Sequence, residues 1–343
     1  MTKCYDRVRR ARPLLGTLVE ITLAGQAERK LHEAADAAFA EVERIHELMS
    51  VHSIESDLYR VNNAPVGSSV SLDERTWRVL DLAADISDAS NGVFDVTVGA
   101  AMMARGDLPR MVHKMPDGHA TYRDIELLTG YCVRLRRALA IDLGGIAKGY
   151  AVDSAVRVLH EHGVPTGCVN AGGDLRAFGN EAQTVHVRDP LEPAIARAEV
   201  ELRDCSLATS ASYETSQDFN AAGVVLDLRA NSDVRVGCSA SVRAGSCTVA
   251  DALAKCVLVL GESSAPLLRR FEADGFLIQD KIPIVIDTAL EDTALADTGS
   301  IDNGSMDAAC PAHGACDDTS RVDPALANRQ SDIMLGDFTG ASS

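Results

Sequence analysis

The sequence predicts an α+β fold built from mixed or antiparallel sheets with flanking helices. Helix-like and strand-like patterns alternate along the first 284 residues, and several predicted strands follow one another between 183 and 242. Runs of consecutive strands favour this class over a regular doubly wound sheet. Beyond about Ile284 the periodicity fades into Asp, Ala, Thr, Gly and Ser. We therefore expect one domain over 1–284 and an acidic, largely disordered tail over 285–343.

The spacing of apolar residues assigns each element in turn. Residues 15–23 alternate as a half-buried strand, and residues 27–49 and 73–90 repeat apolar residues at the three- and four-residue steps of amphipathic helices. Phe94–Val98 is a short strand or an extended loop. Further strands are predicted at 131–145, 167–171, 183–188, 198–203, 223–228, 235–242 and 275–279, and a last helix at 249–260.

The composition excludes several classes of partner. A formal charge of −17 over 343 residues argues against nonspecific binding to nucleic acid or anionic membranes. No apolar run approaches the about 18 residues of a transmembrane segment. The N-terminus also lacks the apolar core and cleavage site of a secretory signal. We therefore expect a cytoplasmic protein, and nine cysteines without C-x-x-C pairs fit free thiols in a reducing compartment.

The tail is strongly acidic, with eleven Asp and Glu against three Lys and Arg after Asp280. Its Cys310, His313 and Cys316 are metal ligands by residue type, and an aspartate could supply a fourth. Their spacing matches no common zinc pattern. Incidental composition is therefore the alternative interpretation.

Two glycine pairs at predicted strand ends are the most informative feature. Asp142 leads into Gly144-Gly145, Lys148 follows, and about three turns of helix come next. A second strand ends at Asn170–Asp174, which contains another glycine pair. Glycine turns let backbone N–H groups approach phosphate closely, and a nearby lysine adds positive charge. This pattern predicts a site for a phosphorylated ligand, and the alternative is a plain pair of tight turns in a βαβ unit.

In order, these segments resemble the FAD:protein FMN transferase family (ApbE-like proteins) over about residues 12–280. The likeness rests on several separated motifs, so it is far more specific than one glycine-rich loop. It implies a single T-fold-related flavin transferase domain. The matching segments are Leu15-Gly16-Thr17, Met49 to Asn62, Gly92 to Gly99, Asp142 to Asp153, Asn170 to Asp174, Thr209-Ser210 with Tyr213, and Ala250 to Ala254.

The resemblance implies FAD as substrate and Mg²⁺ as cofactor, and it assigns roles to residues. Asp142 would reach the flavin nucleotide, Lys148 would lie near phosphate, and the Gly145 carbonyl and Asp251 carboxylate would bind Mg²⁺. Asp142, Asp251 and Lys148 are thus the candidate catalytic residues, although capping or a solvated surface position is the alternative for both carboxylates. The other candidate cofactor-binding residues are Leu15, His52, Val93, Phe94 and Asp95, of which the last three would meet the adenine–ribose end, together with Asn170, Gly172, Gly173 and Asp174.

The sequence departs from the family pattern at four positions. Leu15 replaces a methionine, His52 replaces a tyrosine, and Val224 replaces a histidine that has been suggested as a base. Lys255 replaces a threonine that would be a metal ligand. On a helix, Lys255 stands one turn after Asp251, which favours an ion pair. We expect Lys255 to replace or weaken the metal site, and the alternative is that it points to solvent.

The resemblance also implies a partner, a flavin-accepting protein with a [ST]-[GS]-A-[TS] motif. The chain itself ends in Thr339-Gly-Ala-Ser342-Ser, where Ser342 would be the accepting hydroxyl. Such residues are common in tails, so a chance match is the alternative.

Two functions fit the sequence. The first is transfer of FMN from FAD to a Thr or Ser hydroxyl with release of AMP. The second is a relative that binds FAD or FMN without transfer and acts in electron transfer or regulation. A Rossmann NAD enzyme is disfavoured because no G-x-G-x-x-G follows the first strand. Asp227 and Arg229 are second-line site candidates, whereas His186 is expected to be structural.

Overall fold

The computed structural model describes residues 7–212, 225–229, 232–234, 237–286, 293–294 and 333–335. An eight-stranded sheet runs through the fold, and every pair of neighbouring strands in it is antiparallel. Its strands, in spatial order, are β1 (Arg7–Leu14), β2 (Thr17–Ala24), β6 (Thr166–Ala171), β7 (Asp174–Phe178), β10 (Ser206–Ser212), β13 (Cys238–Ala244), β14 (Asp274–Gln279) and β15 (Ile282–Val285).

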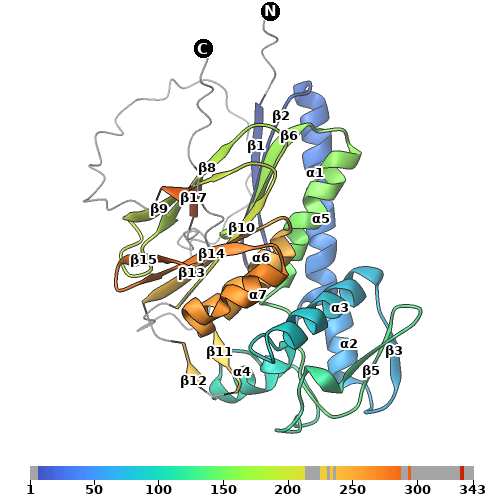
Figure 1. The fold of residues 1–343 in the computed structure, drawn as a ribbon. Helices are drawn as coiled ribbons and strands as arrows, with labels where there is room; N and C mark the ends of the chain where they lie inside the picture. The colour runs from blue at the N-terminus through green and yellow to red at the C-terminus, as the bar shows by residue number, and fades with distance from the viewer. Residues whose placement is uncertain are drawn as a thin grey trace, which may run out of the picture.

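This sheet has a helical layer on one face and a second sheet on the other (Figure 1). The strand β14 shows why, because alternate side chains of a strand point to opposite faces. Leu277 belongs to the core shared with the helices, whereas Phe276 and Ile278 pack with Val185 and Val200 of the second sheet. The helices are α1 (Glu28–Met49), α5 (Ala147–Glu161) and α6 (Cys247–Leu260), and the second sheet has the order β16 (Thr293–Ala294), β9 (Ala196–Leu202), β8 (Gln183–Arg188) and β17 (Ile333–Leu335).

The segment between α1 and α5 forms a smaller unit at the lower end of the view in Figure 1. Its three-stranded antiparallel sheet packs near helix α3 (Glu74–Ala89), whose Trp77 donates a hydrogen bond to the Leu128 carbonyl at 3.2 Å. Its elements are α2 (Asp57–Asn63), β3 (Ser69–Ser71), α3 (Glu74–Ala89), η1 (Val96–Val98), α4 (Gly99–Arg105), η2 (Tyr122–Asp124), β4 (Ile125–Leu128) and β5 (Cys132–Leu135). The remaining elements are β11 (Leu226–Asp227), β12 (Ser232–Asp233), η3 (Gly261–Ser264) and α7 (Ala265–Arg270).

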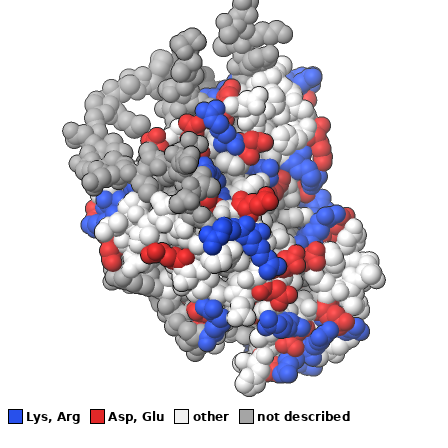
Figure 2. Space-filling model, in the orientation of Figure 1, with Lys and Arg blue, Asp and Glu red and all other residues white. Residues whose placement is uncertain are grey.

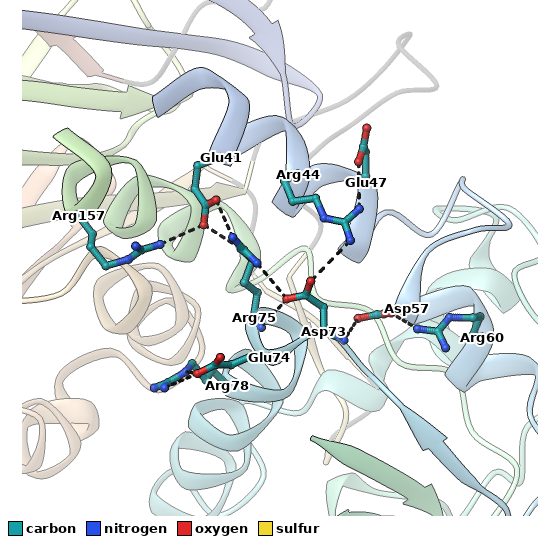
Figure 3. Close-up of polar contacts among 10 residues, drawn as sticks. All are labelled: Glu41, Arg44, Glu47, Asp57, Arg60, Asp73, Glu74, Arg75, Arg78 and Arg157. Atoms are coloured by element: carbon teal, nitrogen blue, oxygen red, sulfur yellow. Dashed lines mark hydrogen bonds and ion pairs between the residues drawn. The ribbon is translucent and has the colours of Figure 1, made fainter. Parts of the chain in front are cut away.

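Ion pairs attach α3 to the long helices (Figure 3). Arg75 contacts both carboxylate oxygens of Glu41 on α1 at 2.8 and 2.9 Å, and Arg157 of α5 contacts the same carboxylate at 3.1 Å. Asp73 caps α3 by accepting the Arg75 N–H at 3.0 Å, and its own N–H donates to Asp57 at 2.8 Å. A bidentate arginine–carboxylate pair fixes orientation as well as distance. These contacts hold α2 and α3 in place beside α1.

The predicted helices 27–49, 73–90 and 249–260 are confirmed within one or two residues at each end. Two predictions were wrong. The strand over 131–145 ends at Leu135, and 137–146 contains no strand, so the glycine pair at 144–145 follows a loop and not a strand. The stretch Phe94–Val98 ends in a 3₁₀ turn, because the Asp95 side chain accepts the Thr97 N–H at 2.8 Å. β1 was missed altogether.

Positive and negative side chains are interspersed over the face shown in Figure 2. The described surface in that view has no large field of one sign. None of the helices in the described residues combines the length and the apolar character that crossing a membrane requires. The six described cysteines, Cys132, Cys168, Cys205, Cys238, Cys247 and Cys256, are thiols and not disulfides, and four of them are buried. Most of the acidic segment 285–343 lies outside the described residues.

Candidate functional site

The turn between β6 and β7 is a tight hairpin made by Gly172 and Gly173. Their φ angles are +65° and +103°, and the flanking Ala171 and Asp174 face each other in the ladder. A two-residue hairpin turn with positive φ at both positions favours glycine. A Cβ on Gly172 would lie 2.4 Å from the Thr17 hydroxyl oxygen, so β2 presses directly on this turn. The predicted Asn170–Asp174 turn and the Leu15-Gly16-Thr17 segment therefore lie side by side.

Buried hydrogen bonds shape the same turn. The Asn170 side-chain oxygen accepts the Gly173 N–H at 2.9 Å, and Asn170 is buried. Asp174 is also buried, with 1 % of its surface exposed. Its Oδ2 pairs with the Lys148 ammonium, whereas its Oδ1 has no hydrogen-bond partner within the described part of the chain.

The second glycine pair lies on the loop 137–146. The Asp142 N–H donates to the Val96 carbonyl at 2.8 Å, and the Asp142 Oδ2 accepts the Gly144 N–H at 3.1 Å. Burial raises the pKa of the Asp142 carboxyl, and the Gly144 hydrogen bond and the nearby His52 oppose part of that rise. Asn62 on α2 holds this loop by donating to the Ile141 carbonyl at 2.9 Å and accepting the Ile141 N–H at 2.8 Å.

The starts of α5 and α6 meet at Gly149. Its N–H donates to Asp251 Oδ2 at 3.0 Å. A Cβ on Gly149 would lie 2.3 Å from the Cys247 carbonyl oxygen and 2.8 Å from the Asp251 Cβ. Only glycine permits this approach of one helix backbone to another. The crossing brings Lys148, in the first turn of α5, within reach of Asp251.

Four charged side chains alternate in sign across this crossing. Lys148 pairs with Asp174, and Lys255 pairs with Asp251. The Lys148 Nζ also lies 3.8 Å from Asp251 Oδ1, which links the two pairs. Asp251 is fully buried, whereas the Lys148 and Lys255 side chains are 30 % and 18 % exposed. Two buried carboxylates thus pair with the ammonium groups of two partly exposed lysine side chains.

The four side chains Lys148, Asp174, Asp251 and Lys255 form a charge cluster, and Gly145 lies beside it. The Cβ position of Gly145 is 3.3 Å from Phe94 Cε2 and 3.7 Å from Lys255 Cε. Phe94, Gly145 and Lys255 therefore come from three separate segments to one place. Asp142 and Gly145 share the loop 137–146, and the Lys255 side chain passes Gly145 and pairs with Asp251.

Other predicted residues take positions around this centre. Leu15 has φ +56° in the turn between β1 and β2, His52 is exposed, and Val93 is buried. The Asp95 carboxylate accepts hydrogen bonds from two backbone groups: Oδ1 accepts the Thr97 N–H at 2.8 Å, and Oδ2 accepts the Tyr122 N–H at 3.2 Å. Burial raises the pKa of that carboxyl despite these bonds.

The second-line candidates do not join the charge cluster by any described contact. Asp227 and Arg229 pair with each other at 2.9 Å, and His186 on β8 lies 3.7 Å from Glu199. Val224, Tyr213, Ser342 and the tail residues Cys310, His313 and Cys316 lie outside the described residues.

The expected Mg²⁺ site does not fit the residues present. Mg²⁺ binds oxygen ligands in a near-octahedral arrangement. Here the ammonium of Lys255, which can only donate hydrogen bonds, occupies one oxygen of the Asp251 carboxylate. The other Asp251 oxygen accepts the Gly149 N–H. Among the described residues no group of three or more His, Cys, Asp or Glu side chains could hold a metal ion.

Sequence reasoning missed the role of Asp153. Its carboxylate caps α6 by accepting the Cys247 and Thr248 N–H groups at 3.0 and 2.9 Å, and it pairs with Arg176 at 2.8 Å. The signal was present, because Asp153 ends the same segment that begins at Asp142. A surface depression of about 440 Å³ beside Asp153 and Arg157 does not include the charge cluster.

The fold combines antiparallel sheets with a layer of helices, which is the α+β class that the sequence predicted. The chain belongs to the ApbE family, whose model matches residues 15–275. The fold predicted from the resemblance is thus confirmed.

Individual relatives agree. A protein of Treponema pallidum named FAD:protein FMN transferase is 29 % identical over 302 residues, which cover 76 % of this chain and 81 % of the relative. One of the same name from Rhodobacter capsulatus is 30 % identical, over 74 % of this chain and 51 % of its own length. The crystal structure of the ApbE protein from Thermotoga maritima superposes with a TM-score of 0.67 at 25 % identity, over 80 % of this chain and 94 % of that one.

Proposed function

We propose that the chain binds FAD at the charge cluster and transfers its FMN half to a Thr or Ser hydroxyl of another protein, releasing AMP. The observation that carries this proposal is the meeting of the Gly172–Gly173 turn, the Asp142 loop and the helix starts around two partly exposed lysine side chains. A diphosphate is the ligand that such a group of cations and glycine turns suits. The names of the relatives support FAD as the donor.

The chemistry is a phosphoryl substitution. The hydroxyl oxygen of the acceptor forms a bond to the phosphorus of the FMN half, and the bond from that phosphorus to the AMP oxygen breaks. AMP leaves with the electron pair, and the hydroxyl proton passes to solvent. Catalysis of this kind depends mostly on positioning and on neutralising charge. Lys148 and Lys255 would supply positive charge beside the diphosphate, and Asp251 and Asp174 would hold both ammonium groups in position.

Asp142 is suited to a different task. Its carboxyl is held by the Gly144 N–H on the loop next to Phe94 and Gly145. Burial raises the pKa of this carboxyl, so it keeps a proton at higher pH than an exposed aspartate does. The carboxyl would hydrogen-bond the nucleotide in either state, since it donates to an oxygen when protonated and accepts from an N–H or hydroxyl when ionised. We assign Asp142 to orienting the nucleotide.

A second function is favoured by one specific observation, the Lys255–Asp251 ion pair. The pair removes a ligand position from the metal site that the family resemblance implies. A valine also stands at the position of the implied base, Val224. In this second function the chain binds FAD or FMN and transfers nothing.

One incubation separates the two. The purified chain is mixed with FAD and an acceptor peptide containing a [ST]-[GS]-A-[TS] motif, in buffers with Mg²⁺ and with EDTA. Transfer predicts release of AMP and a peptide heavier by FMN. Flavin that stays bound without AMP release selects the second function. Absence of bound flavin in both buffers rejects both.

The chain's own C-terminus is a candidate acceptor, because Ser342 lies in a matching motif. Mass spectrometry of the C-terminal peptide from FAD-replete protein tests this directly. An FMN adduct on Ser342 is the expected result, and an unmodified peptide rejects self-modification. Ser342→Ala is the matched variant that must abolish the adduct.

A further inference from the structure

We propose that the Lys255 ammonium takes the place of a divalent metal ion, so that this chain binds the FAD diphosphate without metal. The inference rests on the proposed function, because FAD supplies the negative charge that Lys255 meets. It also explains why the donor set around Asp251 does not fit Mg²⁺.

The position of the Lys255 side chain carries the argument. Its carbon stem passes the Gly145 backbone, with Cδ and Cε 3.9 and 3.7 Å from the Cβ position of that glycine. Its ammonium then reaches the Asp251 carboxylate one helical turn earlier on α6. Lys255 therefore joins the two groups, the Gly145 loop and the Asp251 carboxylate, that were expected to share a metal ion. The alternative of a solvent-directed Lys255 is wrong, since its side chain is only 18 % exposed.

The charges around Asp251 already balance. Two carboxylates, Asp174 and Asp251, face two ammonium groups, Lys148 and Lys255. A divalent ion placed on Asp251 would lie next to both ammonium groups, and like charges at such separations repel strongly in a partly buried site. A diphosphate, in contrast, brings negative charge to the two ammonium groups. The arrangement therefore accepts the nucleotide and disfavours the metal.

Direct metal binding is the first test. Mn²⁺ is titrated into the full chain without nucleotide and followed by electron paramagnetic resonance. The wild-type chain is expected to bind no Mn²⁺ at this site, whereas Lys255→Thr, which frees Asp251 and adds a hydroxyl, is expected to bind it. Lys30→Thr is the matched control because Lys30 is exposed on α1. Wild-type protein that binds Mn²⁺ as tightly as Lys255→Thr overturns the inference.

Nucleotide affinity is the second test. FAD binding to the full chain is measured by flavin fluorescence in EDTA and in Mg²⁺. The wild-type affinity is expected to be the same in both buffers. Lys255→Thr is expected to lose about tenfold in EDTA, the equivalent of about 1.4 kcal/mol, and to recover in Mg²⁺.

The outcomes separate the two proposals. Wild-type protein that binds FAD only with Mg²⁺ overturns the inference and leaves the proposed function standing. Wild-type protein that binds FAD in neither buffer overturns both. If circular dichroism shows that Lys255→Thr does not fold, the two wild-type measurements still decide the matter, because neither depends on the variant.

Discussion

Asn62 of α2 hydrogen-bonds both the N–H and the carbonyl of Ile141, at 2.8 and 2.9 Å. The Asn62 amide pairs with the backbone of Ile141 as a neighbouring strand would in a sheet. Ile141 directly precedes Asp142 in the site loop. Asn62 and Ile141 are both buried. The position of the site loop is thus set by a residue of a distant helix.

Asn62→Ala should destabilise the fold and weaken FAD binding. The change leaves two buried backbone groups without partners, so the free energy of unfolding should fall by about 2–4 kcal/mol. Urea denaturation and FAD titration measure the two effects. Asn63→Ala is the matched control, because Asn63 holds Met111 and His113 instead of the site loop. Equal FAD affinity in Asn62→Ala and wild type would contradict the assignment.

Gly149→Ala should separate α5 from α6. The added methyl group would lie 2.3 Å from the Cys247 carbonyl oxygen, and backbone cannot yield as a flexible side chain does. We expect a loss of about 1–3 kcal/mol in the free energy of unfolding, together with weaker nucleotide binding. Gly245→Ala is the control, since among the described residues no atom beyond its own chain neighbours lies within 4 Å of its Cβ position. A variant as stable as that control would show that the helices separate easily.

Asp251→Asn should be among the most damaging changes. It removes the negative charge that faces Lys255 and Lys148, and breaking a buried ion pair by deleting one partner costs about 3–5 kcal/mol. Chemical denaturation measures the loss. Asp85→Asn, on the exposed side of α3, should change stability little. Similar midpoints for the two variants would argue that the cluster is not coupled.

The raised pKa of the Asp142 carboxyl should make the stability of the fold depend on pH. Its folded pKa is raised above the ordinary 3.8, mainly by burial, so the folded state keeps this proton longer than the unfolded state. Stability from this group is therefore present at low pH and is lost as pH rises from 3.8 through the raised pKa.

The measurement compares wild type with Asp142→Asn across the acid range. The variant lacks this titration. As pH increases, the free energy of unfolding of the wild type should therefore fall relative to that of Asp142→Asn. Asp85→Asn provides the reference curve. Parallel curves for wild type and Asp142→Asn would show that the carboxyl titrates alike in both states.

The long helices could be predicted because their apolar residues repeat with the helical period. The ion pair between Asp251 and Lys255 could be predicted because the two residues are one helical turn apart. The strand predicted over 131–145 failed for a physical reason. Leu139, Ile141 and Leu143 alternate and are all buried, as in a strand, but no second strand pairs with them among the described residues. The Asn62 side chain bonds the backbone of Ile141 instead, and the Val96 carbonyl accepts the next N–H. Alternation reports an extended, buried chain and cannot reveal what pairs with it.

β1 was missed for the opposite reason. Its sequence, RVRRARPL, carries four arginines, and only Val8 is buried. It is held as an edge strand by pairing with β2 and by ion pairs such as Arg12 with Asp36 at 2.7 Å. A strand with only one buried side chain shows no alternation of apolar and polar residues that would reveal it in the sequence. Likewise the role of Asn62 is a contact across 79 residues, which no local pattern contains.

The absence of a side chain at Gly149 has a consequence for motion. The Gly149 backbone lies against the Cys247 carbonyl, so α5 and α6 are in direct backbone contact at their crossing, without a layer of side chains between them. We therefore expect the starts of the two helices to move together, carrying Lys148 and Asp251 with them. Any movement that admits a nucleotide or releases a product is then expected in the loop 137–146 and in the turn around Phe94.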